Sequence, residues 1–259
     1  MSRLPRWLVV LAALAAVFAV LPLAGLASRA NWHELPAQLA TEQARTALWL
    51  SFRTAAASTV LCLVLGVPLG FALASLTGAA RAVLRAVLLA PLVLPPVVSG
   101  LGLLYAFGRK GLLGASLDAA GIPVAFTTAA VVLAQAFVAM PFMVVSVEAA
   151  LAARDGRLEG IAATLGASRS RILSAITLPG IAVAVAMGGV LAFARSLGEF
   201  GATLTFAGSL EGVTRTAPLE IYLARESDPQ AAVALGLVLV VLAIAIVAAA
   251  AGPARRAGT

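Results

Sequence analysis

Two oppositely charged residues lie four positions apart at the end of an apolar stretch. Arg195 and Glu199 fall at i and i+4, a spacing that places both on one face of a helix. A charge at the centre of a membrane helix costs about 2.5 to 3.5 kcal/mol on insertion scales. The two groups are therefore expected to face each other, the protein interior or a water-filled path. The pattern itself does not choose between a structural pair and a role in a path.

A second group of polar residues fills the segment from 150 to 171. Gly166 can take the left-handed geometry that ends a helix, and Ser168 can cap the next helix. A compact helix-turn-helix is expected there, either as a docking surface or as an ordinary interfacial helix. Four apolar residues recur at i, i+3, i+4 and i+7, the spacing of one helix face: Leu158, Ile161, Ala162 and Leu165.

Several kinds of chemistry need residues that this chain lacks. It has one cysteine (Cys62) and one histidine (His33), so a single chain can build neither a disulfide nor a multi-ligand Cys/His metal site. A phosphate-binding loop needs Gly-Lys-Ser/Thr, and the only lysine, Lys110, is followed by Gly111. His33 and Lys110 both fall in expected loops, which argues against a serine hydrolase. No metal, cofactor or enzymatic activity is predicted.

The composition indicates an integral membrane protein. Of the 259 residues, 62% are hydrophobic and 11% are charged, whereas an ordinary soluble domain is roughly 25% charged. The net charge of +7 does not indicate nucleic acid, because the basic residues lie in short gaps between apolar runs rather than in a cluster. The bilayer is the expected environment.

The spacing of charges predicts an all-α, polytopic protein with six transmembrane helices and no soluble domain. A spanning helix needs about 20 apolar residues. The run from Gly201 to Leu210 has only ten residues and is broken by glycines, so it is not expected to span. The six uncharged stretches longer than 18 residues are Trp7 to Ser28, Thr54 to Ala80, Ala86 to Gly108, Ala119 to Val147, Ile172 to Ala194 and Pro229 to Ala254.

The basic residues predict which ends face the cytoplasm. Ten Lys/Arg occur in segments 1–6, 76–85, 150–171 and 252–259, against six in 28–45, 108–123 and 201–230. This bias places both termini and the 150–171 loop in the cytoplasm, across the plasma (inner) membrane. The apolar run from Trp7 to Ala27 has 21 residues, longer than a signal-peptide core, so a retained first helix is expected. Cleavage would leave five spans.

The 150–171 segment resembles the cytoplasmic EAA loop of ATP-binding-cassette (ABC) importer permeases. That pattern reads E-A-A, three residues, G, nine residues and I-x-L-P. Here nine residues separate Gly166 from Ile176, and Thr177-Leu178-Pro179 completes the second half. In the first half only Ala162 agrees, because Gly160 and Ile161 replace the consensus Glu-Ala and Glu159 lies one position early. The identity of the acidic contact stays open.

This resemblance implies a type I ABC importer permease fold whose loop docks into a separate cytoplasmic ATPase. It divides the chain into a first helix with an external loop (1–45), a transmembrane core (46–250) and a short cytoplasmic tail (251–259). The residues that it assigns to coupling are Arg154, Asp155, Arg157, Leu158, Glu159, Ile161, Ala162, Leu165, Gly166, Ser168 and Arg169.

Further strings resemble permeases of the molybdate/sulfate/tungstate importer group. They are Pro91 to Gly100, Ala194 to Thr203 and Thr214 to Tyr222, and the likeness covers about Thr46 to Val247. It implies import of an oxyanion, with molybdate favoured over sulfate or tungstate. The implied partners are two ATP-binding subunits, an extracytoplasmic oxyanion-binding protein and a second copy of the chain.

An oxyanion path must bind its cargo weakly enough to release it, which suits small hydroxyls better than a tight arginine cage. The expected path residues are Arg195, Ser196, Glu199, Thr203 and Thr205. The remaining alternative is an ion-coupled secondary carrier, whose usual marks are inverted repeats and carboxylates at the membrane midplane. No repeat is evident, and Glu148 and Glu199 lie near the ends of spans.

Overall fold

The computed structural model of the chain describes residues 5–256, and side-chain surroundings up to residue 249. Within residues 5–256 every regular element is a helix, as predicted. The α-helices are α1 (Arg6–Ser28), α2 (Leu35–Ala40), α3 (Glu42–Leu61), α4 (Val67–Ser75), α5 (Gly78–Val93), α6 (Pro96–Phe107), α7 (Gly114–Ala119), α8 (Thr128–Ala152), α9 (Arg157–Thr164), α10 (Arg169–Ile172), α11 (Leu178–Leu197), α12 (Gly201–Ala207), α13 (Ala217–Ser227) and α14 (Pro229–Arg256), with two π-helical turns, η1 (Cys62–Gly66) and η2 (Leu173–Thr177).

Helix α8 forms the centre of the bundle. In its most apolar part 61% of the residues are buried, against 28% or less in the other four single spanning helices. It packs against α11, α3, α4 and α12. Glycines make this packing close: a Cβ at Gly70 would lie 2.7 Å from the Cβ of Val147, and one at Gly66 would lie 2.9 Å from Cγ of Met143. Close backbone approach of this kind drives helix association in lipid.

Five single helices are long and apolar enough to span a membrane, and the sixth predicted span is broken. Helices α5 and α6 meet this criterion only as a pair, bent by 117°. The expectation of one continuous helix in the stretch from Ala86 to Gly108 was wrong. Pro95 and Pro96 explain the break, because a residue that precedes proline is pushed out of the helical region. Leu94 and Pro95 both have ψ of 135°.

Two continuous helical segments run beyond the uncharged stretches that predicted them. The segment Glu42–Ser75 begins well before Thr54 and carries the exposed Arg53. The segment Arg169–Leu197 likewise carries α10, η2 and α11. Each contains a π-turn that ends two residues before a proline, at Pro68 and Pro179. Proline lacks an N–H and clashes with the preceding turn, so a local π-bulge lets the helix continue.

Helix α1 lies at the periphery. None of its residues is buried, and it packs on α14, where Leu26 meets Gly236. Just after α1, the backbone N–H of Asn31 donates to Gln230 Oε1 at 3.3 Å. Trp7 and Phe18 are 64% and 79% exposed. The rest of its apolar surface is open to lipid or to another chain.

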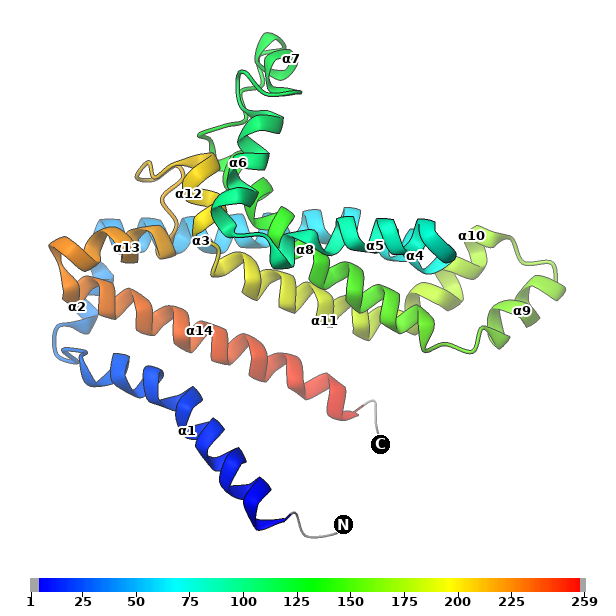
Figure 1. Ribbon diagram of the computed structural model, residues 1–259, viewed down its shortest axis with the longest axis horizontal. Coiled ribbons are helices and arrows are strands. Elements are labelled where there is room, and N and C mark those ends of the chain that lie inside the picture. Colours follow the sequence, from blue (N-terminus) through cyan, green and yellow to red (C-terminus); the bar gives the residue numbers. More distant parts are fainter. Residues whose placement is uncertain (1–4, 257–259) are drawn as a thin grey trace.

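The ends of the helices place the loops. In Figure 1, α2 and α13 lie at one end of the bundle, whereas α9 and α10 lie at the end toward which the start of α1 and the finish of α14 also point. Helices α6 and α7 project from the side. The segment from 201 to 210 holds only the short helix α12, which confirms that it is no seventh span. Of the predicted tail 251–259, α14 includes residues up to Arg256, and 257–259 lie outside the described residues.

Candidate functional site

The 150–171 loop is the helix-turn-helix that its sequence predicts. Gly156, with φ of 65°, starts α9 from the left-handed region, and Gly166, with φ of 84°, follows its end. Both values favour glycine because a Cβ would be strained there. Ser168 Oγ accepts a hydrogen bond from the N–H of Arg171 at 3.4 Å and so caps α10. Local backbone preferences therefore fix the shape of this loop.

The apolar face of α9 is unburied. Leu158, Ile161 and Leu165 are 62%, 57% and 82% exposed, and Ala162 on the same face is half-buried. Three large apolar side chains exposed along about two turns of one helix face, at the end of a bundle, are typical of a helix that docks into a groove.

Glu159 fixes the position of α9 against the rest of the chain. Its Oε1 accepts from Arg154 Nη2 at 2.6 Å and from Thr177 Oγ1 at 3.2 Å. Arg154 follows α8, and Thr177 ends η2 just before α11. One carboxylate thus ties the first turn of α9 to both segments that enter the loop.

Gly180 makes room for this contact. A Cβ at Gly180 would overlap Nη1 of Arg154, so the guanidinium group lies directly against the backbone of α11. The pKa of Glu159 is lowered from its ordinary value of 4.5, first by its own backbone N–H and then by Arg154. Glu159 is consequently an anion held within the chain, a role that the sequence did not predict.

The other charged residues of the loop are more loosely held. Asp155 and Arg157 pair with each other at 3.7 Å, and both side chains are more than 70% exposed. Asp155 Oδ1 also accepts from the N–H of Arg157 at 3.0 Å, which supports the start of α9. Arg169 is exposed on α10. These groups are free to meet another surface.

Arg195 and Glu199 form the pair that their spacing predicted, but not on one helix. Arg195 Nη2 lies 2.7 Å from Glu199 Oε2. The expectation that both belong to the fifth span was wrong, because α11 ends at Leu197 with Gly198 at its C-cap. Glu199 instead accepts from the N–H of Ala202 at 2.8 Å, at the start of α12. Its side chain is 2% exposed, so it is a buried carboxylate with two partners.

The three hydroxyls expected on a path differ in their surroundings. Ser196 is fully buried and shares a 2.9 Å hydrogen bond with Ser58 of α3. Thr205 donates to Gly201 O at 2.9 Å and is half-buried. Thr203 is fully buried, and its Oγ1 has no hydrogen-bond partner among the described residues. Thr203 and Thr205 thus lie on α12, whereas Ser196 lies near the end of α11 and faces α3.

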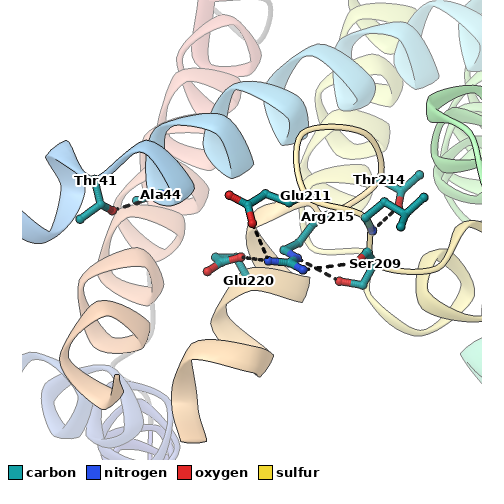
Figure 2. Close-up of polar contacts among 8 residues, drawn as sticks. Thr41, Ala44, Ser209, Glu211, Thr214, Arg215 and Glu220 are labelled. Carbon is teal, nitrogen blue, oxygen red and sulfur yellow. Dashed lines mark hydrogen bonds and ion pairs between the residues drawn. The ribbon is translucent and has the colours of Figure 1, made fainter. Parts of the chain in front are cut away.

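Arg215 organises the loop between α12 and α13. Figure 2 shows it between two carboxylates, Glu211 at 3.4 Å and Glu220 at 3.5 Å. It also donates to the Oγ and the carbonyl oxygen of Ser209 at 3.3 and 3.4 Å. Thr214 Oγ1 closes the turn by accepting from Leu210 N–H at 2.8 Å. With both acids paired to it, Arg215 offers no free positive charge at this end.

A family profile described as "Binding-protein-dependent transport system inner membrane component" matches residues 66–256. The chain belongs to this family. It is 55% identical over 238 residues to the molybdenum transport system permease protein ModB of Mycobacterium tuberculosis, covering 92% of this chain and 90% of the relative. It is 40% identical over 177 residues to ModB of Escherichia coli K12, covering 68% and 77%.

Solved structures agree on the fold of this permease. A chain of the bacterial alginate ABC transporter, in complex with its alginate pentasaccharide-bound periplasmic protein, superposes with a TM-score of 0.72 at 19% identity, covering 96% of this chain and 94% of that one. The MetNI methionine ABC transporter gives 0.60 at 18%, covering 81% and 94%. The protein therefore has the fold of an ABC importer permease, a non-enzymatic, multi-pass component of the inner membrane.

The sequence analysis missed two buried polar residues of the permease. Ser99 of α6 is 3% exposed and Gln135 of α8 is 1% exposed. Neither side chain has a hydrogen-bond partner among the described residues. Gln135 is the single amide in the uncharged stretch from Ala119 to Val147, and a search for charged residues alone does not detect it.

It also missed the partners of Glu148 at the loop end of α8. This carboxylate, 5% exposed, accepts from Arg81 at 2.9 Å and lies 3.6 Å from Arg85. Both arginines belong to α5 and face α8 one turn apart. The two ion pairs of Glu148 therefore hold α5 against α8, close to the 150–171 loop.

Proposed function

We propose that this permease is the transmembrane subunit of an ATP-driven importer that moves molybdate into the cytoplasm. The exposed apolar face of α9 carries the proposal, because Leu158, Ile161 and Leu165 present a ready surface to another protein while Glu159 holds the helix in place. The molybdenum permeases that it resembles over nine-tenths of its length support molybdate as the cargo.

The energy would come from a separate ATP-binding subunit, since this sequence offers no Gly-Lys-Ser/Thr loop. We place α9 and both termini in the cytoplasm, in line with the distribution of basic residues. Two permease chains, two ATP-binding subunits and one extracytoplasmic oxyanion-binding protein would form the complex. The second permease copy would complete the path, because one chain exposes few polar groups that could line it.

Within the path we place Arg195, Ser196, Glu199, Thr203 and Thr205, and Glu199 acts there through Arg195, because a carboxylate repels a dianion. Of these five side chains, only that of Arg195 is positively charged, and it is 30% exposed. Hydroxyl groups and one arginine already paired to a carboxylate would bind a large hydrated dianion more weakly than several free arginines. Weak binding is needed because the anion must also be released.

The test is uptake by the purified permease, co-reconstituted with its ATP-binding subunit and binding protein in liposomes. Radiolabelled molybdate, tungstate and sulfate are compared with ATP inside and with a proton gradient instead. ATP-dependent uptake of molybdate in preference to sulfate supports the proposal. Uptake driven by the proton gradient without nucleotide would identify a secondary carrier, and preference for sulfate or tungstate would change the cargo.

A further inference from the structure

Three neighbouring cavities lie along α14 and join into one crevice. The first, of about 880 Å³, and the second, of about 230 Å³, share Leu197 and Leu239 in their walls. The second and the third, of about 500 Å³, share Ile246. Figure 1 shows α14 running beside α11 from the α13 end of the bundle, and the crevice follows it. It therefore runs along the bundle rather than across it.

The walls of the crevice come from three helices and are apolar over most of their length. Helix α3 supplies Trp49, Phe52 and Ala56, and α11 supplies residues between Val185 and Leu197. The rings of Phe52 and Phe193 meet edge to face at 5.5 Å, so α3 and α11 form a continuous floor. Helix α14 packs on α11 and α13 and forms the opposite wall.

The hydroxyl groups below the mouth of the crevice already have partners. Ser51 Oγ accepts from the N–H of Ala217 at 2.7 Å. Thr59 Oγ1 donates to Ala55 O, also at 2.7 Å. A hydrocarbon chain can therefore fill this space without leaving either hydroxyl unpaired.

The mouth of the crevice, at the end of the bundle opposite the 150–171 loop, carries one charge of each sign. Glu42 and Arg45 both line the first cavity and lie three positions apart at the start of α3. Both are exposed, and neither makes an ion pair among the described residues. Trp49, 65% exposed, follows one turn later, as aromatic residues do at the border between headgroups and hydrocarbon.

The length of the crevice fits one leaflet of a bilayer. The residues of α14 that line it run from Val238 to Ala249, which is about 17 Å of helix. The hydrocarbon of one leaflet is about 15 Å thick, half of a ~30 Å core. An acyl chain that enters beside Trp49 would fill the crevice to its end, whereas a spanning helix of another chain would extend well beyond it.

We propose that this crevice binds a phospholipid whose headgroup carries a phosphate and a primary ammonium, of the phosphatidylethanolamine type. The phosphate pairs with Arg45 and the ammonium donates to Glu42, while one acyl chain lies between α14 and the floor. An anionic headgroup without an ammonium is repelled by Glu42, and a choline headgroup has no N–H to donate to it. In the orientation proposed above the lipid belongs to the outer leaflet, and its binding does not depend on which cargo the permease carries.

The experiment measures lipid binding to the purified permease by native mass spectrometry. The protein is equilibrated in detergent with equal amounts of phosphatidylethanolamine, phosphatidylglycerol and phosphatidylcholine that share the same acyl chains. It is expected to retain one phosphatidylethanolamine per chain with about tenfold preference over either other lipid, the effect of one charge-assisted hydrogen bond. Equal retention of the three lipids, or preference for one of the other two, would overturn the proposal.

Two charge variants test the mouth of the crevice. Arg45→Gln should lower retention of phosphatidylethanolamine about tenfold, because the phosphate loses its partner. Glu42→Gln should remove the discrimination against phosphatidylglycerol. Arg225→Gln and Glu226→Gln are the matched controls, because these two exposed residues of α13 pair with each other at 3.1 Å and do not line the crevice. Wild-type binding in both mouth variants, or an equal loss in the controls, would contradict the assignment.

A third variant separates a lipid from a protein occupant. Ala243 lines the second cavity and is exposed, so Ala243→Phe places a ring in the crevice and leaves the charges at the mouth unchanged. Lipid retention should be lost, whereas Ile244→Phe, at an exposed neighbour outside these cavities, should keep it. If Ala243→Phe instead retains the lipid and dissociates a permease dimer, a second copy occupies the crevice and the proposal is wrong. If Ala243→Phe does not fold, the two mouth variants decide.

Discussion

Two of the Arg–Glu pairs in this permease have nearly equal lengths but very different surroundings. Arg154 and Glu159 meet at 2.6 Å on the loop, where the two side chains are 21% and 24% exposed. Arg195 and Glu199 meet at 2.7 Å at the junction of α11 and α12, where Glu199 is only 2% exposed. The distances do not distinguish the pairs, but the burial of the carboxylate does.

This difference determines what each pair does. A partly exposed pair contributes little net free energy, so Arg154 and Glu159 matter because they orient α9. A buried pair behaves differently: the intact pair is near neutral, whereas removal of one partner leaves a charge without solvation. Glu199 therefore needs Arg195, and the loop pair can be changed without unfolding the permease.

The largest expected effect is that of Arg195→Ala. It leaves Glu199 with only the Ala202 N–H and should destabilise the permease by about 3 to 5 kcal/mol. The measurement is the yield and thermal midpoint of the purified protein. Arg29→Ala is the matched control, because Arg29 is exposed in the loop after α1 and makes no ion pair among the described residues, so about 0.5 kcal/mol or less is expected.

A charge swap, Arg195→Glu with Glu199→Arg, distinguishes a role of this pair in stability from a role in attracting the anion. It restores opposite charges but removes the carboxylate that accepts from Ala202, so protein yield should recover only in part. If the positive charge also draws the anion, uptake per folded complex stays low. A swap that restores both yield and uptake would show that the pair only braces the fold.

The next largest effect is that of Leu158→Asp on assembly. A charge on the exposed apolar face of α9 should weaken binding of the ATP-binding subunit about tenfold or more, as at an interface hot spot. Co-purification of the two proteins measures this. Leu112→Asp is the control, because Leu112 is 88% exposed but lies before α7, away from the loop. Equal loss of complex in both variants would contradict a docking role of α9.

Much of the structure of the 150–171 loop could be predicted from the sequence, because its determinants are local. The apolar spacing from Leu158 to Leu165, the left-handed Gly166 and the cap at Ser168 lie within a few residues of one another. The same is true of the Arg195–Glu199 contact, which forms although Glu199 lies beyond the helix. Short-range patterns were sufficient for these contacts.

Long-range contacts could not be predicted in the same way. Thr177 is 18 positions from Glu159, and no spacing rule joins Arg154 to Gly180. Gln135 was missed because it is uncharged. The bend between α5 and α6 was the avoidable error, because Pro95 and Pro96 were visible and a count of uncharged residues ignored them.

A smaller effect is expected from Gly180→Ala. The added Cβ would overlap the guanidinium of Arg154 and displace it from Glu159, while the rest of α11 stays in place. Uptake per ATP hydrolysed should fall about two- to fivefold with normal co-purification, since overpacking of this size costs about 1 to 3 kcal/mol locally. Gly160→Ala is the control, because nothing lies within 4 Å of a Cβ there. Identical coupling in both variants would show that the position of Arg154 is unimportant.

The smallest expected effect is that of pH on the loop. The pKa of Glu159 lies below its ordinary value of 4.5, so its contribution is complete above 4.5 and is lost as the pH falls through the lower folded value. At neutral pH the group is fully charged, and transport should not respond to modest acidification through Glu159.

Glu159→Gln imitates the protonated form at any pH: it should leave complex formation intact and reduce uptake per ATP hydrolysed to the same degree as Gly180→Ala. If Glu159→Gln instead abolishes co-purification while Gly180→Ala has no effect, Glu159 contacts the ATP-binding subunit directly, and orienting α9 is not its main role.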